Sequence, residues 1–262
     1  MENLATSAKI TWCPGCPNSA ILVAFRKLVE ELKTERSLKL ENLVAVGGIG
    51  CHGKITDYLN INTFTSLHGR LLPTMQGIKI ANPSLQVVGF SGDGDSYSEG
   101  AEHLIHAAKR NSDVNLFVHD NQVFALTTGQ ATATSPKGFK GKSTPSGSTE
   151  EPFNPLLLML AAGATFVART YAGDIEGTKK IMRQAIEHKG FSFVDIIQPC
   201  ITFYDTRDFY NNHVYWLDKK FPSKKLETAI KKVTAQEEKI ALGVFYKVEK
   251  PTFEESLYPQ IT

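Results

Sequence analysis

The sequence contains little cysteine, no long apolar run and no excess of one charge. Only four cysteines occur among the 262 residues. A chain of this size without a secretory leader has neither the need nor the compartment for a disulfide framework. The first residues lack the basic region and apolar core of a secretory signal, and no apolar run approaches the roughly 20 residues that cross a bilayer. These absences predict a cytoplasmic protein with no membrane association, whose thiols serve a metal or a redox group.

The charge balance excludes two classes of partner. Lys and Arg number 29 against 27 Asp and Glu, a formal net charge of +2. Such a balance predicts no nucleic-acid partner and no polybasic membrane patch. Hydrophobic residues make up 42% of the chain, which is enough for the core of one large α/β domain. Partners must therefore be inferred from motifs.

Two stretches near the N-terminus show the pattern of a helix and of a strand. Residues 18–33 place apolar side chains at helical spacing behind a Pro-Asn start, which predicts an amphipathic helix. Residues 43–46 form a short apolar run that leads into the glycine-rich turn 47–52, as is typical of a strand. A cysteine lies just before the helix and another lies in the turn.

The middle of the chain alternates strand and helix patterns. We predict strand 85–90, turn 91–95, helix 97–109 and strand 114–119, and then strand 164–170, helix 174–188 and strand 191–198. A strand, a crossover helix and a second strand form a right-handed unit with parallel strands. The fold class is therefore α/β, with a mostly parallel sheet flanked by helices on both faces.

Two segments stand outside this alternation. Residues 127–155 are rich in Gly, Ser, Thr and Pro and show no periodicity, so they are either mobile or a cover over a site. Residues 223–239 have helical composition with alternating charge, which predicts a solvated helix. We therefore expect one α/β domain over residues 1–222 and a C-terminal helical extension over 223–262.

Acidic and amide side chains follow two strands of the predicted central unit. Asp93 and Asp95 belong to a Gly-Asp-Gly-Asp turn, and Asp120 and Asn121 follow the next strand. Ligands of parallel sheets bind outside the carboxyl ends of the strands, and Mg²⁺ prefers oxygen ligands together with phosphates. A helix that begins near Ser96 would offer amide N–H groups to the same phosphates. The alternative is a tight turn with a self-capping Asp, the commoner meaning of that motif.

The cysteines are spaced as a pair and two single residues. Cys13 and Cys16 form a Cys-x-x-Cys turn, whereas Cys51 and Cys200 are isolated. Four thiolates fit either a 4Fe-4S cluster or a structural zinc ion. Structural zinc sites usually take their second pair from another close turn, and both isolated cysteines are expected at the sheet edge of the phosphate site. The pattern favours the cluster.

Taken together, the motifs resemble the β subunit of the 2-oxoacid:ferredoxin oxidoreductases. The matching motifs are Trp12-Cys13-Pro14-Gly15-Cys16, Gly48-Ile49-Gly50-Cys51-His52, His68-Gly69-Arg70, Gly77-Ile78-Lys79-Ile80-Ala81-Asn82-Pro83, Gly92-Asp93-Gly94-Asp95, His106-Ala107-Ala108-Lys109-Arg110-Asn111 and Gly129-Gln130. The resemblance runs from about Thr11 to Cys200. Two departures are Asp120, where the thiamine-diphosphate signature usually has Asn, and Pro17, where the family more often has Gly.

The resemblance implies a thiamine-diphosphate-binding fold of the diphosphate type and a set of ligands. Asp93, Asn121 and the backbone carbonyl of Val123 would hold Mg²⁺. The four cysteines Cys13, Cys16, Cys51 and Cys200 would ligate one 4Fe-4S cluster. The residues implied to line thiamine diphosphate are Ile49, Gly50, Cys51, His52, His68, Gly69, Gly94, Asp95, Ala125 and Leu126.

The resemblance also implies an activity and partners. The family oxidises a 2-oxoacid, pyruvate or 2-oxoglutarate or both, to acyl-CoA and CO₂ with coenzyme A. The electrons pass through the cluster to ferredoxin. A separate α subunit would supply the carboxylate that activates the aminopyrimidine ring, so the active site would lie between two chains.

Substrate contacts are predicted at two further positions. Lys54 is expected to bind the substrate carboxylate, with an ordinary solvated lysine as the alternative. Leu126 is expected to form a wall of the substrate pocket. His52 and His68 would bond the cofactor or be structural histidines. Two other functions stay open: a non-redox thiamine enzyme with structural cysteines, and a zinc-stabilised scaffold that binds a phosphate ligand.

Overall fold

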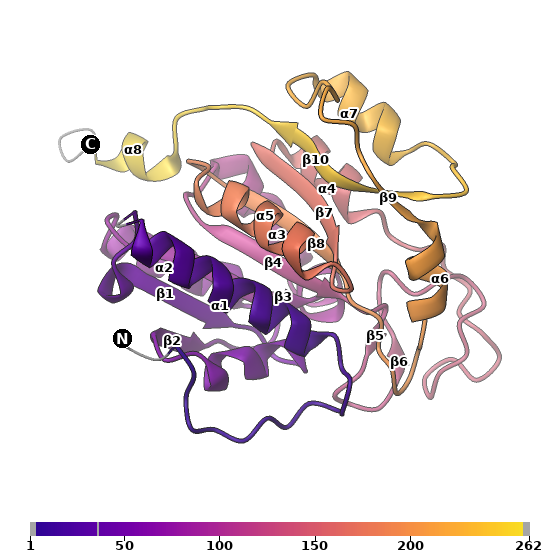
Figure 1. Cartoon of the computed structure of the whole chain (residues 1–262). Coiled ribbons are helices and arrows are strands. Elements are labelled where there is room, and N and C mark those ends of the chain that lie inside the picture. The colour runs from indigo at the N-terminus through magenta and orange to yellow at the C-terminus, as the bar shows by residue number, and fades with distance from the viewer. Residues whose placement is uncertain (1–3, 36, 259–262) are drawn as a thin grey trace.

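One eight-stranded sheet organises the chain. The computed structural model describes residues 4–35 and 37–258, and it orders the strands β2-β1-β3-β4-β8-β7-β10-β9 (Figure 1). The strands are β1 (Leu43–Gly47), β2 (Asn62–Thr65), β3 (Gln86–Gly92), β4 (Asn115–Asp120), β7 (Phe166–Tyr171), β8 (Ser192–Ile197), β9 (Val214–Trp216) and β10 (Ile240–Lys247). All neighbouring pairs are parallel except β10 with β7. The predicted α/β class with a mostly parallel sheet is confirmed.

Helices cover both faces of the sheet. They are α1 (Asn18–Thr34), α2 (Leu71–Ala81), α3 (Ala101–Arg110), α4 (Pro155–Ala162), α5 (Ile175–Ile186), α6 (Arg207–His213), α7 (Leu226–Val233) and α8 (Phe253–Leu257). One hydrophobic cluster joins α1 and α5 to one face, and a second joins α2, α3 and α4 to the other. Both clusters end below the loops at the carboxyl edge of the strands.

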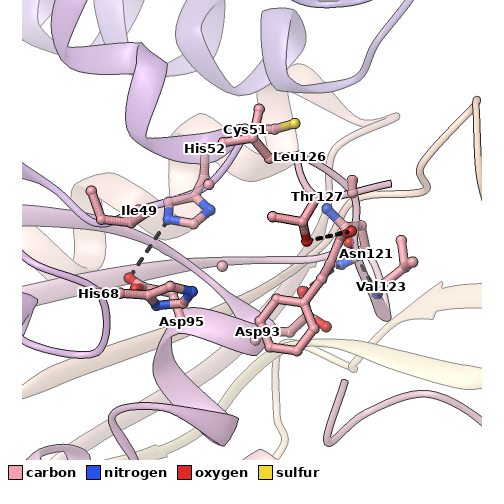
Figure 2. Close-up of a pocket in the computed structure, with 15 residues that line it drawn as sticks. Ile49, Cys51, His52, His68, Asp93, Asp95, Asn121, Val123, Leu126 and Thr127 are labelled. Atoms are coloured by element: carbon pink, nitrogen blue, oxygen red, sulfur yellow. Dashed lines mark hydrogen bonds and ion pairs between the residues drawn. The ribbon is translucent and has the colours of Figure 1, made fainter. Parts of the chain in front are cut away.

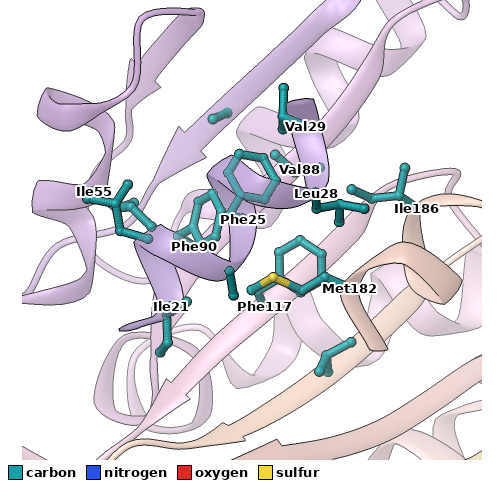
Figure 3. Close-up of a cluster of buried hydrophobic side chains, with 14 of the residues drawn as sticks. Ile21, Phe25, Leu28, Val29, Ile55, Val88, Phe90, Phe117, Met182 and Ile186 are labelled. Carbon is teal, nitrogen blue, oxygen red and sulfur yellow. The ribbon is translucent and has the colours of Figure 1, made fainter. Parts of the chain in front are cut away.

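Aromatic rings form the centre of the core on the α1 side. Phe25 of α1 packs edge-on against Phe90 of β3 with ring centroids 5.0 Å apart, and Phe90 lies 5.6 Å from Phe117 of β4. Met182 and Ile186 of α5 close the same cluster (Figure 3). Each fully buried side chain of this size stabilises the fold by about 2 kcal/mol. The strands that carry the site are thus held rigidly from behind.

The central unit differs from the sequence prediction at its turn. Strand β3 continues through Gly92, and a π-helical turn, Gly94–Ser98, follows it. Helix α3 therefore begins at Ala101 rather than at residue 97. The ring of Phe124 packs closely against this turn, because a Cβ on Gly94 would lie 2.2 Å from it. The predicted helix start is wrong because side-chain patterning does not register this local widening.

The C-terminal segment is more than the helical extension that we predicted. Helix α7 lies within the predicted helical stretch, but β10 follows it and pairs with β7 inside the main sheet. Leu242 and Phe245 of β10 are buried in the core. The composition of residues 223–239 indicates the helix, but it gives no sign of the strand that follows it. Residues beyond 222 thus complete the sheet instead of standing outside it.

A buried histidine makes the stability of this fold depend on acid. His188 is 4% exposed, and its Nε2 lies 2.8 Å from Thr165 Oγ1. Burial, with the charge of Lys247, lowers its pKa from 6.5 to about 4. The unfolded chain therefore takes up this proton first as the pH falls. We expect this residue to remove about 3 kcal/mol of unfolding free energy as the pH falls through that window.

The measurement is denaturant unfolding of the wild type and of His188→Gln at a series of pH values. Between pH 6.5 and pH 4 the wild type should lose stability more steeply than the variant. Above that window the two pH profiles should run parallel. Equal slopes inside the window would show that His188 is protonated in the folded chain as readily as in the unfolded chain.

Candidate active site at the carboxyl edge of the sheet

A pocket with a cavity volume of about 70 Å³ opens where β1, β3 and β4 end (Figure 2). The pocket is lined by Ile49, Gly50, Cys51, His52, His68, Gly92, Asp93, Gly94, Asp95, Asn121, Val123, Phe124, Ala125, Leu126 and Thr127. Every residue that we expected at thiamine diphosphate or Mg²⁺ is in this lining except Gly69. The structure therefore brings the predicted loops to one place.

Asp95 connects the three loops that build the pocket. Its Oδ1 accepts a hydrogen bond from the Gly69 amide at 2.8 Å, and His68 Nδ1 lies 2.7 Å from the same oxygen. Its Oδ2 accepts one from Ser91 Oγ at 2.7 Å, and His52 Nε2 lies 3.6 Å away. Burial raises the pKa of Asp95, but the charge and contacts of His52 and the Gly69 and Ser91 bonds outweigh it and lower the pKa to about 2. Asp95 is thus an ionised group that orients both histidines.

Gly69 contributes to the pocket from behind its wall. Its amide binds Asp95, and its φ of +67° lies in the left-handed region that favours glycine. A Cβ at this position would lie 2.4 Å from the Glu99 carbonyl. The residue therefore places the neighbouring His68 at the pocket but does not line it. Its predicted direct contact with thiamine diphosphate stays a prediction.

The three predicted Mg²⁺ ligands lie together in the lining of the pocket. Asp93 is 1% exposed, and its Oδ2 accepts hydrogen bonds from Thr132 at 2.5 Å and Thr134 at 3.0 Å. Its Oδ1 has only a long contact of 3.4 Å with the amide of Asn121. The side-chain oxygen of Asn121 accepts from the Val123 amide at 3.1 Å. Asp93 Oδ1 and the second lone pair of Asn121 Oδ1 thus remain available to a cation.

The electrostatics of Asp93 fit a cation. Burial raises its pKa to about 6, although the hydroxyls of Thr132 and Thr134 lower it. Burial, together with Asp195 and Asp93, also raises the pKa of Asp120 well above its ordinary value. Buried carboxylates of this kind are stabilised in their charged form by a bound divalent ion. The donor set is suited to Mg²⁺, which prefers oxygen ligands and the oxygens of a phosphate group.

The turn between the predicted ligands has an unusual backbone. Gln122, which separates Asn121 from Val123, has a φ of 61° in the left-handed region. Its side-chain oxygen accepts a hydrogen bond from the Tyr210 hydroxyl at 3.3 Å, and its carbonyl accepts one from Ser135 Oγ at 2.6 Å. These contacts hold a conformation that costs energy, as is common at binding sites.

The four cysteines, a close pair and two residues distant from it in the sequence, come together beside this pocket. All are free thiols. Burial, and to a smaller degree the neighbouring Cys51, Cys200 and Cys13, raise the pKa of Cys16 to about 11. Across residues 4–35 and 37–258, no three His, Cys, Asp or Glu side chains are arranged to hold a single metal ion. Trp12 Nε1 fixes the cysteine loop by donating to the Cys51 carbonyl at 2.6 Å. Cys51 also lines the pocket, so the thiol group and the pocket share a residue.

The two predicted substrate residues are placed differently. Leu126 lines the pocket and is 47% exposed, as expected for a wall that a substrate could contact. Lys54 does not line the pocket, and its Nζ lies 3.4 Å from the Thr11 carbonyl. Burial raises the pKa of Cys51, and the charge of Lys54 partly offsets this rise, which places Lys54 at the cysteine side of the site. Both roles stay predictions.

The irregular segment 127–155 packs over the site. Thr132 and Thr134 bind Asp93, and Thr127 lines the pocket. Further along, Phe139 packs edge-on against Tyr204 at 5.2 Å, in the cluster that contains Cys200. These contacts favour a cover over the site, one of the two alternatives for this segment. The two threonines could not be predicted because nothing in the composition of the loop separates them from its other hydroxyls.

Comparisons with known proteins agree with this geometry. Residues 48–196 match the family "Thiamine pyrophosphate enzyme, C-terminal TPP binding domain", and residues 200–260 match the C-terminal family of the pyruvate ferredoxin oxidoreductase beta chain. The chain is 40% identical over 253 residues to a 2-oxoacid:ferredoxin oxidoreductase subunit beta of Saccharolobus solfataricus, covering 91% of this chain and 82% of that one. The chain belongs to this β-subunit family.

Other members of the 2-oxoacid:ferredoxin oxidoreductases are similarly related. The KorB subunit of a 2-oxoglutarate synthase from Archaeoglobus fulgidus is 42% identical over 191 residues, covering 73% of this chain and 70% of that one. A solved 2-oxoglutarate:ferredoxin oxidoreductase from Magnetococcus marinus, with 2-oxoglutarate, coenzyme A and succinyl-CoA bound, superimposes with a TM-score of 0.93 at 34% identity. That match covers 99% of this chain and 90% of the solved chain. The predicted family and its thiamine-diphosphate-binding fold are confirmed.

One further structural finding concerns membranes. None of the helices within residues 4–35 and 37–258 combines the length and apolar character required to span a bilayer.

Proposed function

We propose that this β subunit binds Mg²⁺-thiamine diphosphate and one 4Fe-4S cluster and, with an α subunit, converts a 2-oxoacid and coenzyme A to acyl-CoA and CO₂. The observation that carries the proposal is Cys51, which lines the pocket and belongs to the four-thiol group. Electrons released at the thiamine-diphosphate pocket would have only a short distance to travel to the cluster, because Cys51 belongs to both sites. Ferredoxin is the proposed final acceptor, and a cytoplasmic location stays a prediction.

Different residues of this chain would bind the metal ion and orient the histidines at the pocket. Asp93, Asn121 and the Val123 carbonyl would hold Mg²⁺ and through it the diphosphate. Asp95 keeps His68 and His52 oriented at the pocket. Thiamine diphosphate, when bound, supplies a carbanion that adds to the keto carbon and takes up the electron pair left by CO₂. The protein contributes position and electrostatics, which its rigid sheet supports.

The spacing of the cysteines supports a cluster over a zinc ion. Four thiolates can hold either group, but a structural zinc ion usually takes its second pair of ligands from another close turn. Cys51 and Cys200 are each isolated in the sequence. The two possibilities differ in colour, since an iron-sulfur protein purified anaerobically is brown and a zinc protein is colourless.

The mouth of the pocket supports the proposal of an α subunit. Apolar side chains lie exposed there and on the neighbouring edge strand β2: Leu67 is 77% exposed and Phe64 of β2 is 52% exposed. Ile49 and Leu126, which line the pocket, are also exposed. Exposed apolar groups that gather at one place mark an interaction surface. The pyrimidine-binding half of the active site would come from the chain that covers this mouth.

The experiment is a comparison of the β subunit alone with the pair co-expressed with its α subunit. Both are assayed anaerobically for acyl-CoA formation with pyruvate and with 2-oxoglutarate, with a viologen as electron acceptor. We expect activity from the pair and none from the β subunit alone. Full acyl-CoA synthesis by the isolated β subunit would contradict the proposal, as would an inactive pair that retains both cofactors.

Lys54 is the proposed anchor of the substrate carboxylate, and its substitution tests this role. Replacing it by Ala should weaken the apparent affinity for the 2-oxoacid about 10- to 100-fold, because one charge-assisted contact would be lost. The affinity is taken from KM in the co-expressed pair, and Lys39→Ala, away from the site, is the control. An unchanged KM in Lys54→Ala would reject the anchor role.

A further inference from the structure

Gln198 lies between the two candidate cofactor sites. It directly follows β8, is 1% exposed, and its backbone amide donates to the Asp120 carbonyl at 2.8 Å. Its side-chain oxygen accepts a hydrogen bond from Asn121 Nδ2 at 3.3 Å. Its Nε2 lies 3.9 Å from Cys16 Sγ. One buried side chain thus contacts a proposed Mg²⁺ ligand and a proposed cluster ligand.

We propose that Gln198 is a positioning residue that couples the metal-diphosphate site to the iron-sulfur site through its single amide group. The inference rests on the proposed function and adds a role for a residue to it. Gln198 does not line the pocket and is not one of the four cysteines, so it acts through Asn121 and Cys16.

The direction of the hydrogen bonds fixes both amides. The Val123 amide donates to Asn121 Oδ1, so the Asn121 NH₂ group faces Gln198. Gln198 must present its oxygen to that donor, because the reverse orientation would place two NH₂ groups against each other. Its own NH₂ group then donates to the Pro199 carbonyl at 3.1 Å and faces the Cys16 sulfur. The chain of donors thus runs in one direction, from the metal site to the thiols.

Each end of this chain has a physical consequence. At the metal end, the hydrogen bond from Asn121 Nδ2 to Gln198 Oε1 holds the Asn121 amide group in place. Removing an outer partner of this kind commonly changes metal affinity. At the cluster end, an N–H donor near a sulfur stabilises the more negative, reduced cluster and raises its reduction potential. Replacing Gln198 should therefore change two quantities that belong to different cofactors. A merely structural residue would have no reason to move both.

Three variants of the co-expressed pair separate these effects. Gln198→Leu removes both amide contacts at similar volume. Gln198→Glu keeps an oxygen for Asn121 but gives up the NH₂ group that faces Cys16. Thr202→Val is the matched control, because the Thr202 hydroxyl donates to Cys13 Sγ at 3.3 Å and makes no contact with the metal site among the described residues. The measurements are the cluster midpoint potential, by an electron paramagnetic resonance titration, and the Mg²⁺ affinity at saturating thiamine diphosphate.

We expect Gln198→Leu to lower the midpoint potential and to weaken Mg²⁺ binding about 10- to 100-fold. Gln198→Glu should lower the potential while Mg²⁺ binding stays close to that of the wild type. Thr202→Val should lower the potential with Mg²⁺ binding unchanged. If folded Gln198→Leu leaves either quantity at its wild-type value, the inference is rejected. If that variant does not fold, an unchanged potential in Gln198→Glu rejects it instead.

The same experiment separates this inference from the proposed function. A wild-type pair without a cluster signal, or without Mg²⁺-dependent binding of thiamine diphosphate, would overturn the proposed function. A wild type with both properties and variants that move neither would overturn only the role of Gln198.

Discussion

Replacing Asp93 by Asn should abolish Mg²⁺-dependent binding of thiamine diphosphate and, with it, the oxidation of 2-oxoacids. Asp93 is the only carboxylate among the three proposed Mg²⁺ ligands, and it is buried beneath the pocket. An amide of the same shape keeps the hydrogen-bond acceptor for Thr132 and Thr134 but removes the negative charge. Loss of a direct ligand should exceed the effect of losing an outer partner, so we expect affinity to fall on the order of a hundredfold or more.

Calorimetric titration of thiamine diphosphate with and without Mg²⁺ measures this loss. Asp57→Asn is a suitable control, because Asp57 is an exposed carboxylate of the same chain. The control should bind as the wild type does. Wild-type binding by Asp93→Asn would show that the metal is held elsewhere, and the proposed Mg²⁺ site would then be wrong.

Replacing Cys16 by Ser should remove the cluster and leave the thiamine-diphosphate pocket functional. Cys16 belongs to the interacting thiols but does not line the pocket, unlike Cys51. A hydroxyl is a poor substitute for a thiolate at iron, so iron content and broad visible absorption should fall to background. Viologen reduction by the pair should fall with them, while Mg²⁺-dependent binding of thiamine diphosphate should persist.

Iron analysis, visible spectra and cofactor binding on the same preparation test this separation. Ser19→Ala, on the neighbouring first turn of α1, is the control and should retain the cluster. A brown, fully reducing Cys16→Ser pair would exclude Cys16 as a ligand. Loss of both cofactors in a folded variant would show that Cys16 is needed for thiamine-diphosphate binding as well as for the cluster.

The sequence predicted the parts of the site that follow strands. Asp93 and Asn121 lie where the carboxyl ends of β3 and β4 were expected, because adjacent parallel strands end at one edge. The cysteine loops could be assigned for the same reason, since Cys51 follows β1 and Cys200 lies shortly after β8. Patterning and topology together were enough to gather these residues.

The sequence did not reveal contacts that depend on side-chain direction. Thr132 and Thr134 contact Asp93 from an aperiodic loop, and Gln198 contacts Asn121 and Cys16 from the position directly after β8. Strand β10 was missed because its pairing with β7 spans a long stretch of sequence. One signal in the sequence could have identified Gln198 as a residue of the site: it directly follows β8 and precedes the Pro199-Cys200 pair.

The most direct test of the proposed function follows the cluster while substrate is added. The co-expressed pair is purified anaerobically, loaded with Mg²⁺ and thiamine diphosphate, and mixed with a 2-oxoacid while its visible absorption is recorded. We predict that the broad absorption bleaches on addition of substrate, and that bleaching disappears when Mg²⁺-thiamine diphosphate or the α subunit is left out. A colourless pair, or a coloured pair whose absorption does not change with pyruvate or 2-oxoglutarate, would contradict the proposed function.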